Sequence, residues 1–194
     1  LVLDTQVYSN TGGQACTSGF TGQVSDMAAF GKIWKGKPEV RKEIGLIGIA
    51  HRNAWVMQGS IANVTHLLEG YIEGLNSRRP ALFNIYAACQ PEHGIGDDAS
   101  AAQNKLAVES RAYPLFRFDP RLAAEGKNPL QLDSKAPSIG FEEFANSENR
   151  FRVLKKNNPE QAEQLLAASA KDSATRYDLY KKLAEMSADC GTKE

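Results

Sequence analysis

A run of residues with oxygen-bearing side chains follows the apolar start of the chain. Leu1 to Asp4 is typical of the second half of a buried parallel strand, and the segment Thr5–Gln14 after it is rich in hydroxyl, amide and glycine residues. Mg²⁺ prefers octahedral oxygen ligands, which the Thr5 hydroxyl, the Val7 backbone carbonyl and the Asn10 amide could supply. The glycines of this segment let the backbone pass close to a phosphate. The segment therefore suits a magnesium diphosphate, and an ordinary turn that satisfies its own backbone groups is the alternative.

A second polar loop is expected beside the first. Ala81 to Ala88 is typical of another buried strand, and the loop Cys89–Ser100 leaves its carboxyl end. Before this strand, apolar residues recur at spacings of three and four from Asn63 to Leu75, which predicts an amphipathic helix. The order strand, helix, strand indicates a parallel α/β sheet, in which ligands bind outside the carboxyl ends of the strands. We therefore expect the two loops to share one site.

The other patterns of the first 118 residues predict the surroundings of this sheet. Ile44 to Ala50 is an apolar run that we interpret as a strand, and Ala101 to Arg111 is predicted to be a helix. A further strand is predicted over Tyr113–Phe118. A short helical pattern around Val24–Phe30 precedes a basic connector, Lys32–Lys42, which we interpret as solvated.

The C-terminal third has a different character. Residues 119–140 are rich in proline, glycine and polar residues, which predicts an extended arm. Helices are predicted over Phe141–Leu154 and Pro159–Met186, with Asn158 as the N-cap of the second. We therefore divide the chain into an α/β domain over residues 1–118, the arm over 119–140 and a helical C-terminal extension over 141–194.

The composition is that of an ordinary globular protein. Of 194 residues, 42% are hydrophobic and 24% charged, and the formal net charge is +0, so nothing indicates a nucleic acid or an anionic membrane as partner. No apolar run approaches the roughly 20 residues that span a bilayer, and the N-terminus has no signal-like pattern. We expect a cytoplasmic protein, and, because no methionine precedes Leu1, a sequence that is incomplete at its start.

The three cysteines are widely separated. Cys16, Cys89 and Cys190 form no pair with the spacing of a zinc or disulfide framework. A lone cysteine is most simply a small buried residue, although it can also be one ligand of a cluster whose other ligands lie elsewhere.

Acidic residues and a histidine are concentrated in the second loop. Glu92, His93, Asp97 and Asp98 could bind a metal or transfer protons, since carboxylates and histidine do both. The simpler interpretation, which we favour from the sequence, is a solvated loop.

Several segments in order resemble one known family. Leu1–Gln14 is similar to the end of the thiamine-diphosphate motif of the pyruvate:ferredoxin (flavodoxin) oxidoreductases, and the similarity resumes at Thr21–Val24, at Ile85–Cys89 and at Tyr113–Pro120. It continues over Asn128–Pro137. The resemblance implies part of a parallel-sheet thiamine-diphosphate-binding fold, followed by the family's extended arm and C-terminal helices.

The resemblance also implies roles for the residues of the first loop. The Thr5 side chain and the Val7 carbonyl would bind Mg²⁺, and Asn10 would position substrate or an intermediate in catalysis. The residues that would line the diphosphate and the reacting end of the cofactor are Thr5, Gln6, Val7, Tyr8, Ser9 and Asn10. The family's remaining Mg²⁺ carboxylate belongs to a Gly-Asp-Gly motif upstream, which this chain does not contain.

For the cysteines, the resemblance favours a ligand at one position. Cys89 matches the residue that supplies one thiolate to the 4Fe–4S cluster nearest the thiamine, the other three coming from upstream. Cys16 and Cys190 match no ligand position, and we interpret both as incidental.

The implied activity is oxidative decarboxylation of a 2-oxoacid, with pyruvate as the first candidate. The products would be acyl-CoA and CO₂, with coenzyme A as co-substrate, and electrons would pass through iron–sulfur clusters to ferredoxin or flavodoxin. A homodimer is expected. The chain departs from the usual pattern at Ala15–Phe20 and at Pro91–Asp98, which leaves the identity of the 2-oxoacid open. The alternatives are a cluster-free thiamine-dependent 2-oxoacid decarboxylase and a truncated, non-catalytic module for cofactor binding or assembly.

Overall fold

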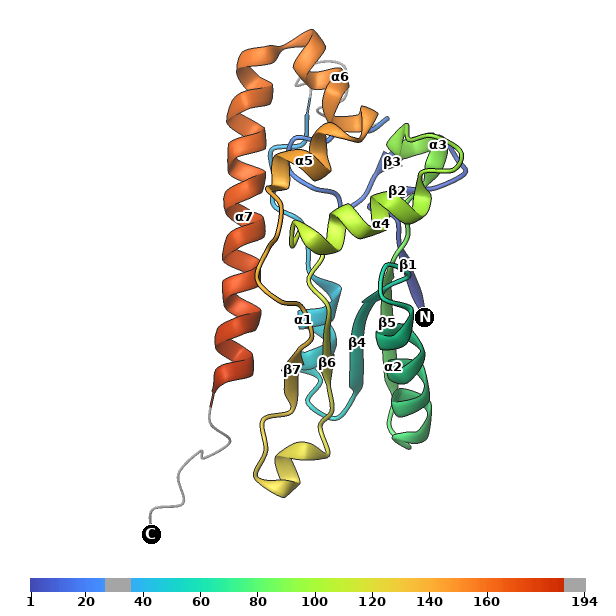
Figure 1. The fold of residues 1–194 in the computed structure, drawn as a ribbon, viewed down its shortest axis with the longest axis vertical. Coiled ribbons are helices and arrows are strands. Elements are labelled where there is room, and N and C mark those ends of the chain that lie inside the picture. Colours follow the sequence, from blue (N-terminus) through green and yellow to red (C-terminus); the bar gives the residue numbers. More distant parts are fainter. Residues whose placement is uncertain (27–35, 187–194) are drawn as a thin grey trace.

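A five-stranded mixed sheet forms the centre of the computed structural model, which describes residues 1–26 and 36–186 (Figure 1). The order across the sheet is β1 (Val2–Asp4), β5 (Ala81–Tyr86), β4 (Trp55–Ser60), β6 (Phe116–Phe118) and β7 (Leu130–Leu132). β5 is parallel to both β1 and β4, whereas β6 runs antiparallel to β4 and β7 antiparallel to β6. The predicted α/β fold is confirmed, and it is consistent with part of a thiamine-diphosphate-binding fold.

Helices cover both faces of the sheet. α2 (Val64–Asn76) packs on one face, where Leu67 and Tyr71 contact the cluster around Met57. The predicted helix is therefore confirmed, and Asn63 caps it by accepting a hydrogen bond from the backbone of His66 at 3.1 Å. All six residues of β4 are buried, as expected of a strand covered on both sides.

The strand predicted over residues 44–50 is wrong, because this segment is the helix α1 (Ile44–Ala50). Its two glycines lie three residues apart on the face toward the sheet. A Cβ at Gly45 would meet the Phe116 ring at 2.7 Å, and one at Gly48 would meet Leu82 at 2.7 Å. The missing side chains let the helix backbone lie close to the strands. A seven-residue apolar run does not distinguish a strand from a buried helix by its pattern alone.

The predicted arm is partly a strand of the sheet. The strand predicted over Tyr113–Phe118 is shorter than expected, and the segment 119–140 contains a 3₁₀ turn (Leu122–Glu125) and β7. Asn128 donates hydrogen bonds to the carbonyls of Leu183 and Ala184 at 2.7 and 3.0 Å. The segment therefore contacts both the sheet and the end of the last helix.

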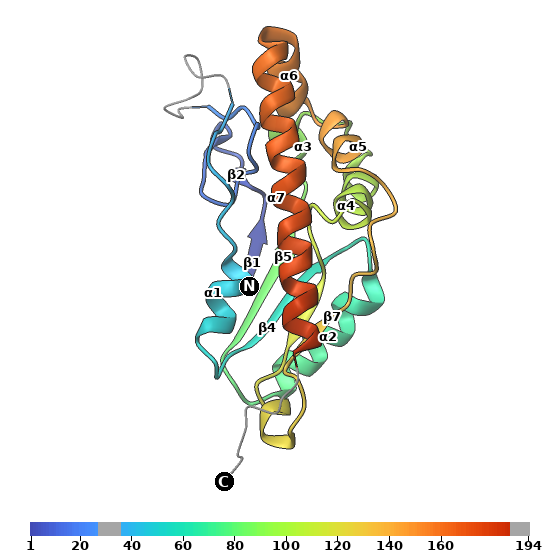
Figure 2. The same ribbon diagram turned by 90° about the vertical axis from the view of Figure 1, so that its left-hand side faces the viewer.

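Four helices lie between residue 100 and the end of the described chain. α4 (Ser100–Glu109) agrees with the predicted helix over 101–111, whereas the helix predicted over 141–154 is two, α5 (Phe141–Asn146) and α6 (Asn149–Asn157). The long helix α7 (Pro159–Glu185) runs along the side of the molecule (Figures 1 and 2). It begins as predicted, with Asn158 accepting a hydrogen bond from the backbone of Gln161 at 3.3 Å. Most of the predicted helical pattern around 24–30, the first part of the basic connector and Cys190 lie outside the described residues.

An aromatic core joins the C-terminal helices to the N-terminal segment. The ring of Phe20 lies 5.6 Å from that of Phe144 and 5.9 Å from that of Phe141, both on α5. Tyr86 at the end of β5 and Phe151 on α6 belong to the same buried cluster. Burial of these rings fixes α5 and α6 against the carboxyl ends of β1 and β5. Across residues 1–26 and 36–186, every helix is too short or too polar to span a membrane.

Candidate functional site

The two polar loops meet at the carboxyl ends of β1 and β5, as the sequence predicts. The backbone N–H of Ala87 donates to the Asp4 carbonyl at 3.2 Å, which continues the pairing of the two strands. Nε2 of His93 lies 2.7 Å from the Thr5 carbonyl. Figure 1 shows the hairpin β2–β3 and the short helix α3 (Gln90–His93) together beyond these strand ends.

The first loop is a hairpin with a left-handed turn. β2 (Val7–Tyr8) pairs antiparallel with β3 (Gln14–Ala15). Gln6 and Asn10 both have positive φ, of 56° and 64°. Asparagine tolerates this conformation, but for a glutamine it is strained, so other contacts must hold Gln6 in place.

Thr5 and Val7 present two oxygens side by side. Thr5 Oγ1 lies 2.9 Å from the Val7 carbonyl oxygen and donates a hydrogen bond to it. Adjacent ligands of an octahedral Mg²⁺, each about 2.1 Å from the ion, lie about 3 Å from each other. The two oxygens are therefore already separated by the distance that two neighbouring Mg²⁺ ligands require, and the donor set of hydroxyl and carbonyl suits this ion.

The other residues predicted to line the cofactor differ in exposure. The Gln6 side chain is buried, at 1% exposure, and donates back to the Asp4 carbonyl, so only its backbone can face a ligand. Tyr8 and Asn10 are exposed. Ser9 Oγ is buried and has no hydrogen-bond partner within the described part of the chain. Buried hydroxyls are normally paired, so Ser9 Oγ has hydrogen-bonding capacity that a bound phosphate could use.

His93 is fully buried, which corrects the prediction of a solvated loop at this position. Its Nδ1 lies 3.2 Å from Glu148 Oε1, close enough for an electrostatic contact although the two are not aligned as a hydrogen bond. Glu148 is also fully buried and sits in the break between α5 and α6. By contrast, Asp97 and Asp98 are exposed, as predicted.

Arg150 links this histidine and carboxylate to the first loop. Its Nε contacts Glu148 Oε2 at 2.6 Å, and its other two nitrogens donate to the side chains of Gln23 and Gln6 at 3.1 and 3.3 Å. Burial alone would raise the pKa of Glu148, but the charge of Arg150 and the adjacent His93 imidazole outweigh it and hold this pKa below its usual range. Glu148 is therefore ionised in the folded protein at neutral pH.

A second buried network lies beneath Asp4. Arg41 contacts Asp4 Oδ2 at 2.8 Å and also pairs with Glu43. Glu43 in turn contacts Arg176 at 3.2 Å and accepts a hydrogen bond from the Tyr180 hydroxyl at 2.9 Å. These contacts connect the end of β1 to α7, so the base of the first loop is held by the C-terminal helix.

Cys89 lies at the start of the second loop. It immediately precedes α3, is half-buried and is not in a disulfide, and its carbonyl accepts a hydrogen bond from the backbone of His93 at 2.8 Å. The described residues contain no group of three or more His, Cys, Asp or Glu that could hold a metal ion. Cys89 could therefore provide a single thiolate to a cluster, and no more.

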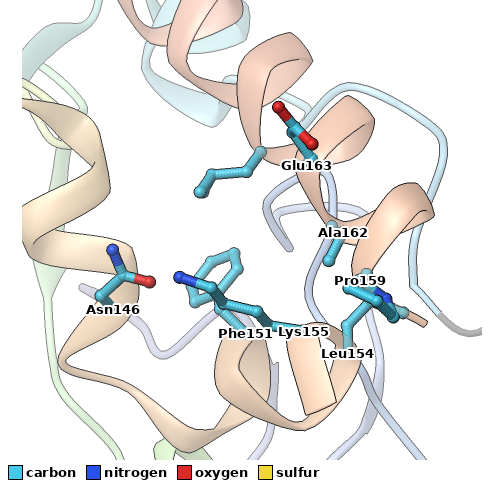
Figure 3. Close-up of a pocket in the computed structure, with 9 residues that line it drawn as sticks. Asn146, Phe151, Leu154, Lys155, Pro159, Ala162 and Glu163 are labelled. Carbon is cyan, nitrogen blue, oxygen red and sulfur yellow. The ribbon is translucent and has the colours of Figure 1, made fainter. Parts of the chain in front are cut away.

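Cavities adjoin the first loop and also lie away from it. One of about 530 Å³ is lined by Tyr8, Cys16, Lys37 and Lys42, and burial lowers the pKa of Lys37. A smaller one, of about 140 Å³, lies beside Gly12–Gly13 and Arg150. Figure 3 shows a third, of about 360 Å³, between α5, α6 and α7. In it, Phe151 is surrounded by apolar side chains, with Asn146, Lys155 and Glu163 at its rim; these residues take no part in the contacts of the loops.

The sequence patterns did not identify Glu148 or Arg150. Each is far in the sequence from its partners: 144 positions separate Arg150 from Gln6, and 62 separate Glu148 from Tyr86. The break between α5 and α6 that places Glu148 has no proline or glycine to mark it. The only sequence signal was the cluster of His93 with acidic residues, which could be interpreted as a metal or proton-transfer site or as a solvated loop.

Known proteins match nearly all of this chain. A pyruvate:ferredoxin oxidoreductase of Moorella thermoacetica is 42% identical over 186 residues, which is 95% of this chain and 15% of that protein. A probable pyruvate-flavodoxin oxidoreductase of Escherichia coli is 40% identical over 185 residues, and a pyruvate-flavodoxin oxidoreductase of Trichormus variabilis is 38% identical over 185 residues. In both of these, too, the match covers 95% of this chain and 15% of the relative.

The match is thus to one segment of much longer proteins. The chain spans about 15% of the length of these curated relatives. No protein-family model matches it. By sequence, the chain is homologous, over 95% of its length, to one segment of pyruvate:ferredoxin and pyruvate-flavodoxin oxidoreductases.

Proposed function

We propose that this chain forms part of the thiamine-diphosphate site of a 2-oxoacid oxidoreductase. The observation that carries the proposal is the pair of oxygens Thr5 Oγ1 and Val7 O, 2.9 Å apart at the carboxyl end of a parallel strand. This is the edge of an α/β sheet at which ligands bind, and the separation suits two neighbouring Mg²⁺ ligands. The sequence identity to oxidoreductases named for pyruvate supports the same proposal.

Each predicted site residue has a role in this proposal. Thr5 and Val7 would hold the Mg²⁺ of the diphosphate, the residues from Thr5 to Asn10 would line the cofactor, and Asn10 would orient the substrate or an intermediate. When bound, thiamine diphosphate supplies a carbon nucleophile and an electron sink for decarboxylation, while the protein supplies orientation and electrostatics. Cys89 would give one thiolate to a 4Fe–4S cluster, which would supply electron-transfer chemistry beside the cofactor.

The overall reaction converts a 2-oxoacid anion and coenzyme A into acyl-CoA and CO₂ and releases two electrons and one proton. Pyruvate is the first candidate substrate, because the relatives are named for it. Ferredoxin or flavodoxin accepts the electrons, as the names of the relatives also suggest. We place the enzyme in the cytoplasm and expect it to act as a homodimer.

The test is the anoxic reduction of a viologen dye by the complete gene product with pyruvate and coenzyme A. Thr5→Ala should reduce the rate at least about tenfold at limiting Mg²⁺, because one metal ligand is lost. The control is Thr175→Ala, since Thr175 is an exposed threonine on α7 whose hydroxyl donates to the Lys171 carbonyl of the same helix at 2.9 Å.

Three other outcomes would argue against parts of the proposal. If the cofactor-loaded enzyme reduces no dye with pyruvate or any other 2-oxoacid, the oxidoreductase function is wrong. Release of CO₂ without dye reduction would support the cluster-free decarboxylase instead. Equal rates for Thr5→Ala and Thr175→Ala would contradict the assignment of the metal ligand.

A further inference from the structure

His93 contacts the backbone of the residue that we propose as a metal ligand. Its side chain is 0% exposed, at the end of α3, and Nε2 lies 2.7 Å from the Thr5 carbonyl oxygen. A carbonyl can only accept a hydrogen bond, so Nε2 carries a proton and donates it. The contact joins two segments 88 positions apart in the sequence.

The opposite edge of the ring faces a fixed carboxylate. Nδ1 lies 3.2 Å from Glu148 Oε1, and Glu148 is itself held by Arg150 at 2.6 Å and by the Gln103 side-chain amide at 2.9 Å. The imidazole therefore lies between the Thr5 carbonyl and a carboxylate that two other side chains hold in place. A buried side chain with a polar partner on each side has little freedom to change its orientation.

The loop needs such support because its backbone is strained next to Thr5. Gln6 has a φ of 56°, which residues other than glycine and asparagine rarely adopt. The backbone carbonyls before and after the Gln6 Cα each accept a hydrogen bond from a side chain distant in the sequence. His93 donates to the Thr5 carbonyl, and the Gln23 amide donates to the Gln6 carbonyl at 2.9 Å. These two contacts orient the peptide between Thr5 and Val7, and this orientation brings Thr5 Oγ1 to 2.9 Å from Val7 O.

We propose that His93 is a positioning residue that holds Thr5 and Val7 in the arrangement that receives the Mg²⁺ of a diphosphate. This inference rests on the proposed function and extends it to a residue that does not itself touch the metal. Side chains that orient metal ligands from behind commonly change metal affinity when they are replaced. His93 acts through its N–H, so a side chain of similar reach that keeps an N–H should replace it in part.

The experiment is a calorimetric Mg²⁺ titration of the complete gene product in the presence of thiamine diphosphate. His93→Phe and His93→Leu both remove the donor, one of them with a ring of similar size, and should raise the Kd for Mg²⁺ by about 10- to 100-fold. His93→Gln keeps an amide N–H and should recover most of the affinity. Thermal unfolding without ligands identifies the variants that are folded, and either folded variant without the donor suffices.

The chain offers a matched control in His66. It is also a buried histidine, at 5% exposure, and its Nε2 lies 3.0 Å from a carboxylate, that of Asp133, but it belongs to α2 and contacts neither loop. His66→Leu should lower stability and leave the Kd for Mg²⁺ unchanged.

The outcomes separate the inference from the proposed function. If the wild-type protein binds Mg²⁺ with thiamine diphosphate and folded His93→Phe or His93→Leu binds it equally well, the positioning role is wrong. The role is also wrong if His66→Leu weakens Mg²⁺ binding as much as the His93 variants do. A wild-type protein that binds no Mg²⁺ with thiamine diphosphate contradicts the proposed function itself, and this inference with it.

Discussion

At the scale of single residues, Cys89 is a free thiol placed near the first loop, where a cluster ligand is proposed. It follows the strand β5 after Ala87 and Ala88, and the carboxyl end of this strand lies beside the first loop; the Cys89 thiol is in no disulfide. The described residues around it hold no group of three metal-binding side chains, so a cluster at this place must draw its other thiolates from elsewhere. Cys16 is equally half-buried, but its thiol lies 3.2 Å from the Ser18 hydroxyl in the turn after the hairpin.

Replacing each cysteine separates the two positions. We predict that Cys89→Ser lowers the iron content of the complete gene product by about one 4Fe–4S cluster per chain, because serine is a poor ligand for iron in such clusters. Cys16→Ser should leave the iron content unchanged. Iron analysis and electron paramagnetic resonance of the reduced protein measure both. Full iron content in Cys89→Ser would show that Cys89 is no cluster ligand.

The sequence located the first loop because its chemistry is local. The hydroxyl of Thr5 and the carbonyl of Val7 are two residues apart, so a short motif contains both. The residues that support the loop lie far away in the sequence, and their role depends on burial. His93 looks like a solvated residue in a polar loop until α6 places Glu148 beside it. No pattern in a single sequence shows such a contact.

At the scale of elements, α1 shows how packing decides between two interpretations of one pattern. Its residues are apolar, and β-branched isoleucines at three of seven positions favour a strand. The glycines three residues apart favour a helix, because they fall on one helical face and let it approach the sheet. Packing against β4 and β5 decides between strand and helix. In the helix, Gly48 lies close to Val56 of β4 and Leu82 of β5.

Gly48→Ala tests this packing. An alanine in an exposed helix is more stable than a glycine by up to about 1 kcal/mol. Here a Cβ would lie 2.7 Å from Leu82 and 3.1 Å from Val56, so we predict that Gly48→Ala lowers the free energy of unfolding by about 1–3 kcal/mol.

Urea unfolding of the chain measures this change. The control is Ile47→Ala on the same helix, whose side chain is 49% exposed and should cost less. A Gly48→Ala variant more stable than the wild type would contradict the close approach of α1 to the sheet.

Other elements were predicted where the local signals were strong. The cap at Asn158 marked the start of α7, and the spacing of Leu67 and Tyr71 marked α2. The interrupted helix at Glu148 and the strand β7 within the predicted arm were missed, because both depend on partners elsewhere in the fold. β7 is only three residues long and owes its conformation to pairing with β6.

At the scale of the whole molecule, buried charges connect the ends of the chain. Asp4 is the last residue of β1, Arg41 and Glu43 precede α1, and Arg176 and Tyr180 belong to α7. Burial alone would raise the pKa of Glu43, but Arg41 and Arg176 outweigh it, so its pKa lies below the ordinary value of 4.5. The charged form of Glu43 therefore stabilises the fold.

Linkage then gives the sign of the pH dependence. Because the pKa is lower in the folded than in the unfolded protein, the contribution of Glu43 is complete above about pH 4.5 and is lost as the pH falls below that value. We predict that Glu43→Gln lowers the free energy of unfolding by about 3 kcal/mol at pH 7, since two arginines lose their shared partner. The variant should also lose less stability than the wild type between pH 4.5 and pH 3.

Urea unfolding of the chain across this pH range measures both effects. Glu185→Gln is a suitable control, because Glu185 is 63% exposed and pairs only loosely with Lys181 at 3.9 Å. Parallel acid profiles for wild type and Glu43→Gln would contradict the role of Glu43 in joining β1 to α7.

The most direct test of the account is a crystal structure of the complete gene product with thiamine diphosphate and Mn²⁺, whose anomalous scattering locates the ion in place of Mg²⁺. We predict Mn²⁺ bound by both Thr5 Oγ1 and the Val7 carbonyl oxygen, each at about 2.2 Å, with the two oxygens still about 3 Å apart. The diphosphate should lie along the loop toward Ser9 and Asn10. An ion bound elsewhere, with the Thr5 hydroxyl still donating to the Val7 carbonyl, would contradict the account.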